Sequence, residues 1–365
     1  MSPPYGAIIL GGGLAGASLA AELASRVSLL ILEKEEHPGH HASGRSTGMF
    51  IPSYGGPAIA ALAEASRSYF EAAPGSRPPL LTPRAVLHVS SRRRAAPSPT
   101  ATWVSQAKVR ELCPILRTHN LKSAWLERGT GELDAVGVHQ RLITTAIRRG
   151  GALRLGVQPH KISHDGDAWR LQIEGEELSC SALINATGAW ADDTAAGCGL
   201  TPLGLSAYRR TVVLVDPPEP RKPVLEGPIV KDMADTYYFR PFGQDLLVSP
   251  CDETPSAPTD AQPETQDIAL AVARLKRATG HEPRRIKHQW AGLRSFAPDR
   301  LPVIGWDLRA PNFFWFAGLG GYGVQTAPAA GRLAAALFLA AKPPGAGRMG
   351  GPAPRDFSPM RLAGI

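Results

Sequence analysis

Three glycines near the start of the chain have the spacing of a dinucleotide-binding turn. They are Gly11, Gly13 and Gly16, and an acidic residue, Glu33, follows roughly twenty residues later. In such a turn the first glycine permits a tight bend, the second lets the backbone approach a diphosphate, and the third lets the helix pack on the strand. The diphosphate then lies at the positive N-terminus of the helix. A carboxylate at Glu33 would bind ribose hydroxyls, which favours a free ribose over a 2′-phosphate.

The elements on either side of these glycines support the same interpretation. The runs 7–10 and 29–32 are wholly apolar, as buried parallel strands are, and a helix rich in Ala and Leu is expected between them. The glycine spacing alone is weak evidence, because the chain contains 38 glycines. Together with the two strands it predicts a Rossmann-like unit and therefore an α/β fold.

Two later segments would complete the same site. Residues 181–188 form another apolar strand that ends on small residues, which allow close approach to a nucleotide. Near the C-terminus, a strand at 313–317 precedes the glycine turn 318–323 and a long helix from about 326. A second strand, glycine turn and helix indicates a second wall of one site; the alternative is a tight turn without a ligand.

Arg294 is the leading candidate for binding a substrate. It lies in the otherwise apolar run 290–296, and a charge in such surroundings needs a partner. The planar guanidinium can hold a carboxylate at two points and stays charged at every working pH. We expect Arg294 to bind an organic acid, with a structural ion pair as the alternative.

The composition limits the classes of protein to which the chain can belong. Its 365 residues, 43% of them hydrophobic, are enough for two domains. The net charge of +8 would attract polyanions, but it is mostly dispersed arginine, and the compact basic run 92–94 lies in a segment typical of an exposed loop. We therefore expect no nucleic-acid partner.

The chain shows no signature of membrane insertion. The apolar N-terminal stretch is interrupted by glycines that the nucleotide turn needs, so it is not interpreted as a secretory signal, and no later apolar run is long enough to span a bilayer. We expect no integral membrane segment and a cytoplasmic location. The four cysteines lie far apart and no histidine spacing suits zinc, so free thiols and no metal are expected.

The rest of the chain alternates helices rich in Ala and Leu with short β-branched strands. The expected helices are at 57–70, 109–112 and 138–149. An antiparallel meander is expected at 161–163, 169–173 and 177–180, and further strands at 85–89, 124–127, 211–215, 237–240 and 246–249.

Several of these motifs together resemble the D-amino-acid oxidase superfamily of flavoproteins, and within it the branch of bacterial D-arginine dehydrogenase. They are the opening nucleotide unit and the segments 41–46, 185–190, 290–296 and 320–326. The likeness follows the same order over nearly the whole chain. It implies noncovalent FAD, bound by a Rossmann-like domain of the glutathione-reductase type, and a second, mostly antiparallel-sheet substrate domain.

The resemblance also implies how the chain divides. It assigns 1–84, 138–205 and 290–365 to a discontinuous FAD-binding domain, and 85–137 and 206–289 to the substrate-binding domain.

The resemblance assigns cofactor contacts to a set of residues in these segments. The set comprises Gly11, Gly13, Leu14, Ala15, Gly16, Glu33, Lys34, His41, Ser43, Arg45, Ser46, Thr187, Gly188, Trp190, Gly292, Gly320, Gly321, Tyr322, Gly323, Val324, Gln325 and Thr326. The polar groups of Ser43, Arg45 and Ser46 suit phosphate, and the amides of the second glycine turn suit negative charge on a reduced flavin. A histidine around His41 carries a covalent flavin in dimethylglycine-dehydrogenase-like relatives, but the D-arginine enzyme has a similar histidine without a bond.

Four residues are implied to hold the substrate carboxylate and close the site. They are Arg294, Arg210, Tyr238 and Tyr54. Neighbours on a strand point to opposite faces, so only one of Arg209 and Arg210, and one of Tyr237 and Tyr238, can face the site.

The side-chain pocket departs from the D-arginine enzyme. Val86 stands where that enzyme has a glutamate for the cationic side chain, and Met49 and Ile51 replace a histidine and a threonine. Burying a guanidinium there without a partner would be costly. We therefore predict that Met49, Ile51 and Val86 form an apolar pocket and that the substrate is a D-amino acid with a neutral, hydrophobic side chain.

The expected reaction is oxidative deamination. The α-hydrogen leaves as hydride to flavin N5, and the imino acid hydrolyses to a 2-oxo acid and ammonia, without an essential side-chain base. Oxygen, a quinone or another electron carrier would then reoxidise the flavin. The alternatives are a glycine- or sarcosine-type amine oxidase or dehydrogenase, an NAD-dependent dehydrogenase and a tRNA-modifying flavoprotein.

Overall fold

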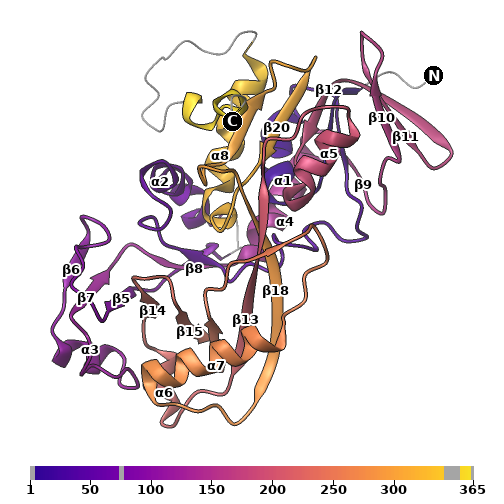
Figure 1. Cartoon of the computed structure of the whole chain (residues 1–365). Coiled ribbons are helices and arrows are strands. Elements are labelled where there is room, and N and C mark those ends of the chain that lie inside the picture. Colours follow the sequence, from indigo (N-terminus) through magenta and orange to yellow (C-terminus); the bar gives the residue numbers. More distant parts are fainter. Residues whose placement is uncertain (1–4, 74–77, 341–353, 363–365) are drawn as a thin grey trace.

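The computed structural model describes residues 5–73, 78–340 and 354–362, and within them the strands form two large sheets and one small sheet (Figure 1). The large sheets have eight and nine strands, and the small sheet has three. Helices pack mainly on the eight-stranded sheet, whereas the nine-stranded sheet lies at the other end of the molecule.

The eight-stranded sheet is built around the nucleotide unit. Strand β1 (Tyr5–Leu10) lies between β2 (Leu29–Leu32) and β12 (Glu176–Asn185) and runs parallel to both, while β20 (Phe313–Ala317) is parallel to β12 on its other side. These strands are buried on both faces of the sheet, which explains their apolar sequences. The remaining strands are β9 (Ala152–Arg154), β10 (Lys161–His164), β11 (Trp169–Ile173) and β19 (Val303–Trp306).

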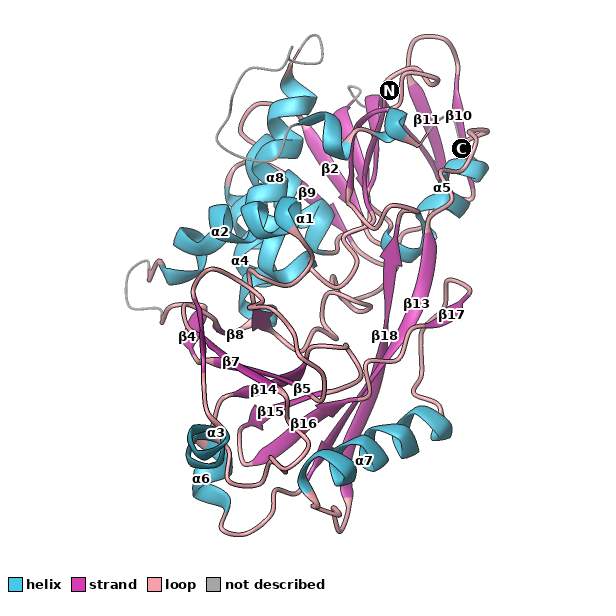
Figure 2. Ribbon diagram, turned by 60° about the vertical axis from the view of Figure 1, so that its left-hand side comes forward, coloured by secondary structure: helices cyan, strands magenta, loops and turns pink. Residues whose placement is uncertain are grey.

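Helices cover both faces of this sheet. Figure 2 shows four helices stacked on one side of it: α1 (Leu14–Leu23), α2 (Pro57–Glu71), α4 (Ala135–Arg148) and α8 (Gly323–Leu339). Helix α5 (Ala191–Gly197) packs on the opposite face. Nine of the ten residues of α1 are buried, because α4 and α8 pack against it as well as the sheet.

The nine-stranded sheet is mostly antiparallel, and its pairing of β14 with β5 is parallel. Its longest ladder joins β13 (Ser206–Val215) and β18 (Ile286–Phe296), which run from this sheet toward the nucleotide unit (Figure 2). The other strands are β5 (Val86–Ser90), β6 (Ala101–Trp103), β7 (Ser123–Glu127), β14 (Ile229–Asp232), β15 (Tyr238–Phe242), β16 (Asp245–Ser249) and β17 (Thr254–Ser256).

Shorter elements complete the fold. The small sheet joins β3 (Met49–Phe50), β8 (Gly131–Leu133) and β4 (Leu81–Pro83). Helix α7 (Thr265–Thr279) packs on the nine-stranded sheet. The remaining helices and turns are α3 (Gln106–Leu112), α6 (Arg221–Leu225) and the 3-10 turns Gly188–Trp190, Pro354–Phe357 and Pro359–Arg361.

The fold class expected from the sequence is confirmed, and the expected helices and strands are present with shifted ends. One expectation was wrong. The strands predicted separately at 177–180 and 181–188 are the single strand β12. Its first half pairs antiparallel with β11 and its second half pairs parallel with β1, so no break is needed between them.

The domain ranges implied by the resemblance remain a proposal. In their favour, the strands of the eight-stranded sheet come from 5–32, 152–185 and 303–317. However, β18 stays in the nine-stranded sheet until Phe296, past the proposed boundary at 290. The extreme ends of those ranges, 1–4 and 363–365, lie outside the described residues. In the part of the chain that is described, no helix is long and apolar enough to cross a membrane.

Candidate functional site

A cavity of about 460 Å³ lies between the two glycine turns. Its walls come from both large sheets: the ends of β1 and β2 and the starts of α1 and α8 on one side, and β13, β14, β15 and β18 on the other. Most of the residues that the sequence assigned to a cofactor or substrate therefore meet at one place.

The first glycine turn has the geometry that its spacing predicted. Gly11 has a φ of +100°, and a Cβ there would lie 2.5 Å from the carbonyl oxygen of Ala186. A Cβ on Gly16 would lie 2.0 Å from the carbonyl oxygen of Gly11, so this residue permits close packing and does not itself line the cavity. Gly13 lines the cavity, and a Cβ there would meet only the hydroxyl of Ser43, at 3.1 Å.

Glu33 is buried at the edge of the cavity, at the end of β2. Its Oε2 accepts the N–H of Gly12 at 2.8 Å, and its Oε1 accepts the N–H of Glu35 at 3.0 Å. Both oxygens are thereby fixed in place, and each keeps further acceptor capacity. This arrangement suits ribose hydroxyls, as the sequence predicted.

Helices α1 and α8 both begin at the cavity. Neither has a side-chain cap from its N-cap residue, Gly13 or Tyr322, and the first residues of both helices line the cavity. The hydroxyl of Ser43 accepts the N–H of Leu14 at 2.9 Å and marks the start of α1. Uncapped helix starts favour negative charge. The site thus combines two helix starts, glycines that let a ligand approach the backbone, and the fixed carboxylate of Glu33. This combination fits a dinucleotide such as FAD.

The second glycine turn brings Arg294 to the cavity. A Cβ on Gly321 would lie 2.8 Å from the guanidinium of Arg294, and one on Gly320 would lie 2.3 Å from the ring of Phe296. The N–H of Gly320 already donates to the carbonyl oxygen of Ser295 at 2.9 Å. The Gly320 amide is therefore engaged within the protein, although Gly320 itself lines the cavity, and its assignment to a flavin contact stays a prediction.

Tyr322, Thr326 and Val86 do not line the cavity, contrary to the sequence expectation. Tyr322 packs on Tyr54, and the hydroxyl of Thr326 donates to the carbonyl oxygen of Tyr322 at 2.8 Å. These two residues lie one helical turn apart on the buried side of α8. Val86 lies behind Ile51, because β5 pairs with β14 so that Val86 packs on Ile229.

Arg45 binds protein groups, whereas the sequence suggested phosphate. It donates to the carbonyl oxygens of Ala261 and Ala291, at 2.8 and 3.1 Å, and forms an ion pair with Asp260. Its guanidinium thus joins the loop after β2 to the loop after β17 and to β18. The hydrogen bond from Arg45 holds the pKa of Asp260 below its ordinary value.

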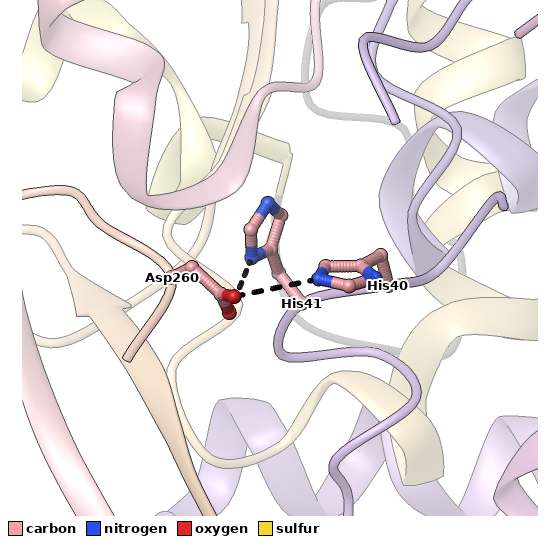
Figure 3. Close-up of side chains that lie close together, drawn as sticks. All are labelled: His40, His41 and Asp260. Carbon is pink, nitrogen blue, oxygen red and sulfur yellow. Dashed lines mark ion pairs between the residues drawn. The ribbon is translucent and has the colours of Figure 1, made fainter. Parts of the chain in front are cut away.

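Figure 3 shows His40 and His41 beside Asp260, at 3.7 and 3.8 Å from its carboxylate oxygens. Two histidines and a carboxylate could together bind a metal ion. However, the guanidinium of Arg45 already pairs with this carboxylate, so we assign no metal to the cluster.

His41 is held at the Glu33 end of the cavity. Its Nε2 lies 2.7 Å from Glu35, and its ring lies 4.6 Å from that of Trp190, over which Lys34 is placed at 3.5 Å. Burial lowers the pKa of His41, and the hydrogen bond with His41 lowers that of Glu35. These contacts group His41 with the ribose acceptor rather than with Arg294. Noncovalent attachment of the flavin stays a prediction.

The substrate end of the cavity contains Arg294 without an anionic partner. Its Nη1 donates to the hydroxyl of Tyr54 at 3.4 Å, and among the residues that the structure describes no carboxylate lies within ion-pair distance. Arg210 also lines the cavity and pairs with Glu253 at 3.1 Å, but its Nε is buried without a partner. Tyr238 donates to Thr47 at 3.2 Å.

Strand alternation selects the residues that face the cavity, as predicted. Arg210 lines it, whereas Arg209 points away to Asp267 and Glu264. Tyr238 lines it, whereas Tyr237 packs into the opposite core.

The side-chain pocket is less apolar than the sequence indicated. Met49 and Ile51 line it as expected, but so do Lys231, Asp235 and Cys251, which sequence reasoning missed. Lys231 forms an ion pair with Asp235, and its Nζ lies 4.8 Å from the ring centroid of Tyr54. The signal was present in the sequence, since Lys231 follows a short apolar run just as Arg294 does.

Two further groups in this pocket stay neutral. Burial raises the pKa of the Tyr238 hydroxyl and of the Cys251 thiol. The arrangement can therefore bind an anion and donate hydrogen bonds to it, and Tyr238 and Cys251 are not bases near neutral pH.

Comparison with known families gives one clear match. The model of the family DAO, FAD dependent oxidoreductase, matches residues 7–337.

Three curated proteins illustrate the similarity. Dimethylglycine dehydrogenase of Rattus norvegicus is 24% identical over 370 residues, covering 92% of the chain and 43% of that protein. The bifunctional tRNA-modification protein MnmC of Polaromonas sp. is 26% identical, covering 91% and 56%. Glycine oxidase of Geobacillus kaustophilus is 23% identical, covering 92% and 93%. The chain thus spans less than half of the dimethylglycine dehydrogenase it matches.

Solved structures show the same fold. Glycine oxidase from Geobacillus kaustophilus superposes with a TM-score of 0.77 at 22% identity, covering 92% of this chain and 94% of that one. L-Proline dehydrogenase from P. horikoshii gives 0.82 at 18% identity, covering 100% and 99%. L-Amino acid deaminase from Proteus vulgaris gives 0.80 at 16% identity, covering 99% and 98%.

Proposed function

The chain belongs to the DAO family of FAD dependent oxidoreductases, and from this premise we propose that it oxidises the carbon–nitrogen bond of a D-amino acid. The cofactor is FAD, which fits the cradle formed by the first glycine turn, Glu33 and the starts of α1 and α8. The reaction would give an imino acid, which hydrolyses to a 2-oxo acid and ammonia.

The unpaired guanidinium of Arg294 carries this proposal. A cation held among apolar strand residues needs an anion, and the described residues provide none within ion-pair distance. A substrate carboxylate supplies it, because the planar fork can bind both oxygens. The Tyr54 hydroxyl, 3.4 Å from Arg294, is placed to donate to the same carboxylate.

When bound, FAD accepts a hydride from the substrate α-carbon. The protein's task is to hold that carbon in place: Arg294 and Tyr54 fix the carboxylate, while Met49 and Ile51 exclude water from the side chain. Because burial raises the pKa of Tyr238 and Cys251, neither is assigned as the base that takes the amine proton, and we expect the substrate to bind with its amine deprotonated. The start of α8 stabilises negative charge in the adjacent cavity.

A glycine- or sarcosine-type amine is the second candidate. Its support is the curated relative named glycine oxidase, which this chain matches over nearly its full length. The structures titled L-proline dehydrogenase and L-amino acid deaminase share the fold, so the fold itself does not select a D substrate. The placement of the chain near D-arginine dehydrogenase also remains a proposal, because the fold does not select that branch of the family.

We test the proposal by mixing the yellow holoprotein anaerobically with D- and L-amino acids, glycine and sarcosine. Bleaching of the flavin absorbance by a D-amino acid, faster than by its L-enantiomer, is the expected result. Bleaching by L-amino acids alone, or by glycine and sarcosine alone, would contradict the D assignment. Reoxidation of the reduced protein by oxygen or by a quinone would then identify the class of electron acceptor.

Tight, salt-dependent binding of tRNA, combined with no reaction with free amino acids, would instead favour an RNA substrate of the kind named for the MnmC relative.

A further inference from the structure

The substrate end of the cavity has an excess of positive charge. Arg210, Lys231 and Arg294 line it, together with one carboxylate, Asp235. Cys251 lines the same part of the cavity and lies within electrostatic range of all four charged side chains. The charges therefore act on a single small volume.

The ion pairs do not neutralise this excess. Glu253 is shared between Arg210, at 3.1 Å, and Arg300, at 2.8 Å, while Lys231 is paired with Asp235. Arg294 has no such partner in the described chain. Asp252 lies in electrostatic range of Arg210, but it accepts the Thr211 N–H and forms no ion pair. Of the three cations that line the cavity, Arg210 and Lys231 thus each have a carboxylate within ion-pair distance, and Arg294 has none among the described residues.

An ordinary amino acid supplies one carboxylate, which pairs with Arg294. It leaves Lys231 dependent on Asp235, whose carboxylate is half exposed. A second acidic group on the substrate would pair with Lys231 inside the pocket, where an ion pair is stronger than at the surface.

Lys231 is the residue placed to receive that second group. Its ammonium lies over the ring of Tyr54, whose hydroxyl contacts Arg294, so the two cations lie on different parts of one side chain. Lys231 is 8% exposed, whereas the carboxylate of Asp235 is about half exposed. Asp235 can therefore turn to solvent when a substrate anion replaces it, but Lys231 cannot leave the pocket.

We propose that the pocket selects an amino acid with a second carboxylate, which binds Lys231 while the α-carboxylate binds Arg294. This inference rests on the proposed amino-acid oxidation, and it replaces the hydrophobic side chain predicted from the sequence. Met49 and Ile51 then pack against the methylene groups between the two acids.

Size-matched substrates test the proposal. D-Glutamate and D-glutamine differ in charge but hardly in size, as do D-aspartate and D-asparagine. We expect kcat/KM of the holoenzyme to be about 10- to 100-fold higher for the acid of at least one pair, the effect of one hydrogen bond to a charged group in a closed site. Equal values within both pairs, or a preference for the amides or for D-leucine, would overturn it.

Variants of Lys231 and Asp235 test whether the preference for the acid depends on this ion pair. Lys231→Met should remove the preference, so that the acid and the amide have similar kcat/KM, and Lys231→Arg should retain it. Lys222→Met, an exposed lysine on α6, should leave both values as in the wild type. Asp235→Asn should lower KM for the acid, because it removes the competing carboxylate. Asn tolerates the left-handed backbone at this position, where φ is +53°. A raised KM in Asp235→Asn would show that the pair is only structural.

A binding measurement separates this inference from the proposed function. Glutarate, a dicarboxylate that cannot be oxidised at an amine, should perturb the flavin spectrum at about 10-fold lower concentration than butyrate. If no amine reduces the flavin, the proposed oxidation is wrong, while glutarate binding still reports on the two cationic positions. If neutral amino acids are oxidised and glutarate binds no better than butyrate, the oxidation stands and the dicarboxylate assignment is wrong.

Discussion

The two ends of the cavity are held by different kinds of interaction. At the nucleotide end, backbone groups dominate: Glu33 is fixed by two main-chain N–H groups, and two helix starts face the cavity. At the substrate end, Arg210 of β13, Lys231 of β14 and Arg294 of β18 supply the positive charge. Backbone geometry follows a short local motif, whereas the side-chain cluster depends on strands far apart in sequence. The first end can therefore be recognised from a local motif, whereas Lys231, Asp235 and Cys251 at the second end were found only in the structure.

The largest effect is expected from Arg294→Met. If substrate binding depends on this guanidinium, kcat/KM should fall by about 10²- to 10³-fold, mainly through KM, which corresponds to losing one partner of a buried charge pair. Flavin content, measured by absorbance, should stay normal. Loss of flavin instead would mean that Arg294 supports the nucleotide end, and the division between the two ends would fail.

Gly11→Ala should damage the nucleotide end by about 2 kcal/mol or more of unfolding free energy, with loss of bound flavin. The Cβ would clash with the main chain at Ala186, and the φ of +100° disfavours any side chain. Gly175→Ala is the matched control: its φ is +73°, but its Cβ would meet no atom within 4 Å. Urea unfolding of both variants separates the clash from the backbone strain, and equal losses would argue against a tight nucleotide turn.

Glu33→Gln should weaken flavin binding about tenfold and leave the turnover of flavin-loaded protein unchanged. In the wild type each carboxylate oxygen accepts one main-chain N–H and is placed for a ribose hydroxyl. The amide keeps one acceptor oxygen and replaces the other with a donor NH₂ group. Titration of apoprotein with FAD measures the affinity. A change in KM for the amino acid, with FAD affinity unaltered, would contradict the assignment of Glu33 to the nucleotide end.

Asp260→Asn should have the smallest effect, a loss of about 1 kcal/mol or less, because this carboxylate is half exposed. Arg45 lowers the pKa of Asp260, so its contribution to stability is present above the ordinary aspartate pKa of about 3.9 and is lost as the pH falls through the lower folded value. The difference in Tm between wild type and variant should therefore be constant near neutral pH and shrink below about pH 4. A difference that grows on acidification would exclude the ion pair as its cause.

The sequence predicted most of the fold because its strongest signals are local. Apolar runs, glycine turns and helix periodicity each report on one segment, and the first glycine turn has the predicted conformation down to Gly11 and Gly16. Strand alternation also predicted that only one of Arg209 and Arg210 faces the cavity, and the resemblance assigned that place to Arg210.

The errors arose where the outcome depends on pairing between distant segments. Val86 was assigned to the pocket, but its register with Ile229 places it behind Ile51. The same pairing brings Lys231 into the cavity, and no local pattern says that β14 lies between β5 and β15. Arg45 was assigned to phosphate because its partners, near 260 and 291, are more than 200 residues away.

The bridge made by Arg45 has a consequence for how the holoprotein is assembled. During synthesis the first βα unit leaves the ribosome early, but the carbonyl groups that anchor Arg45 and the start of α8 belong to the last third of the chain. Until those residues emerge, the nucleotide site consists of the first glycine turn and the start of α1, without the start of α8. We therefore expect FAD to be captured late in biosynthesis, and a polypeptide truncated before residue 261 to lack the cofactor.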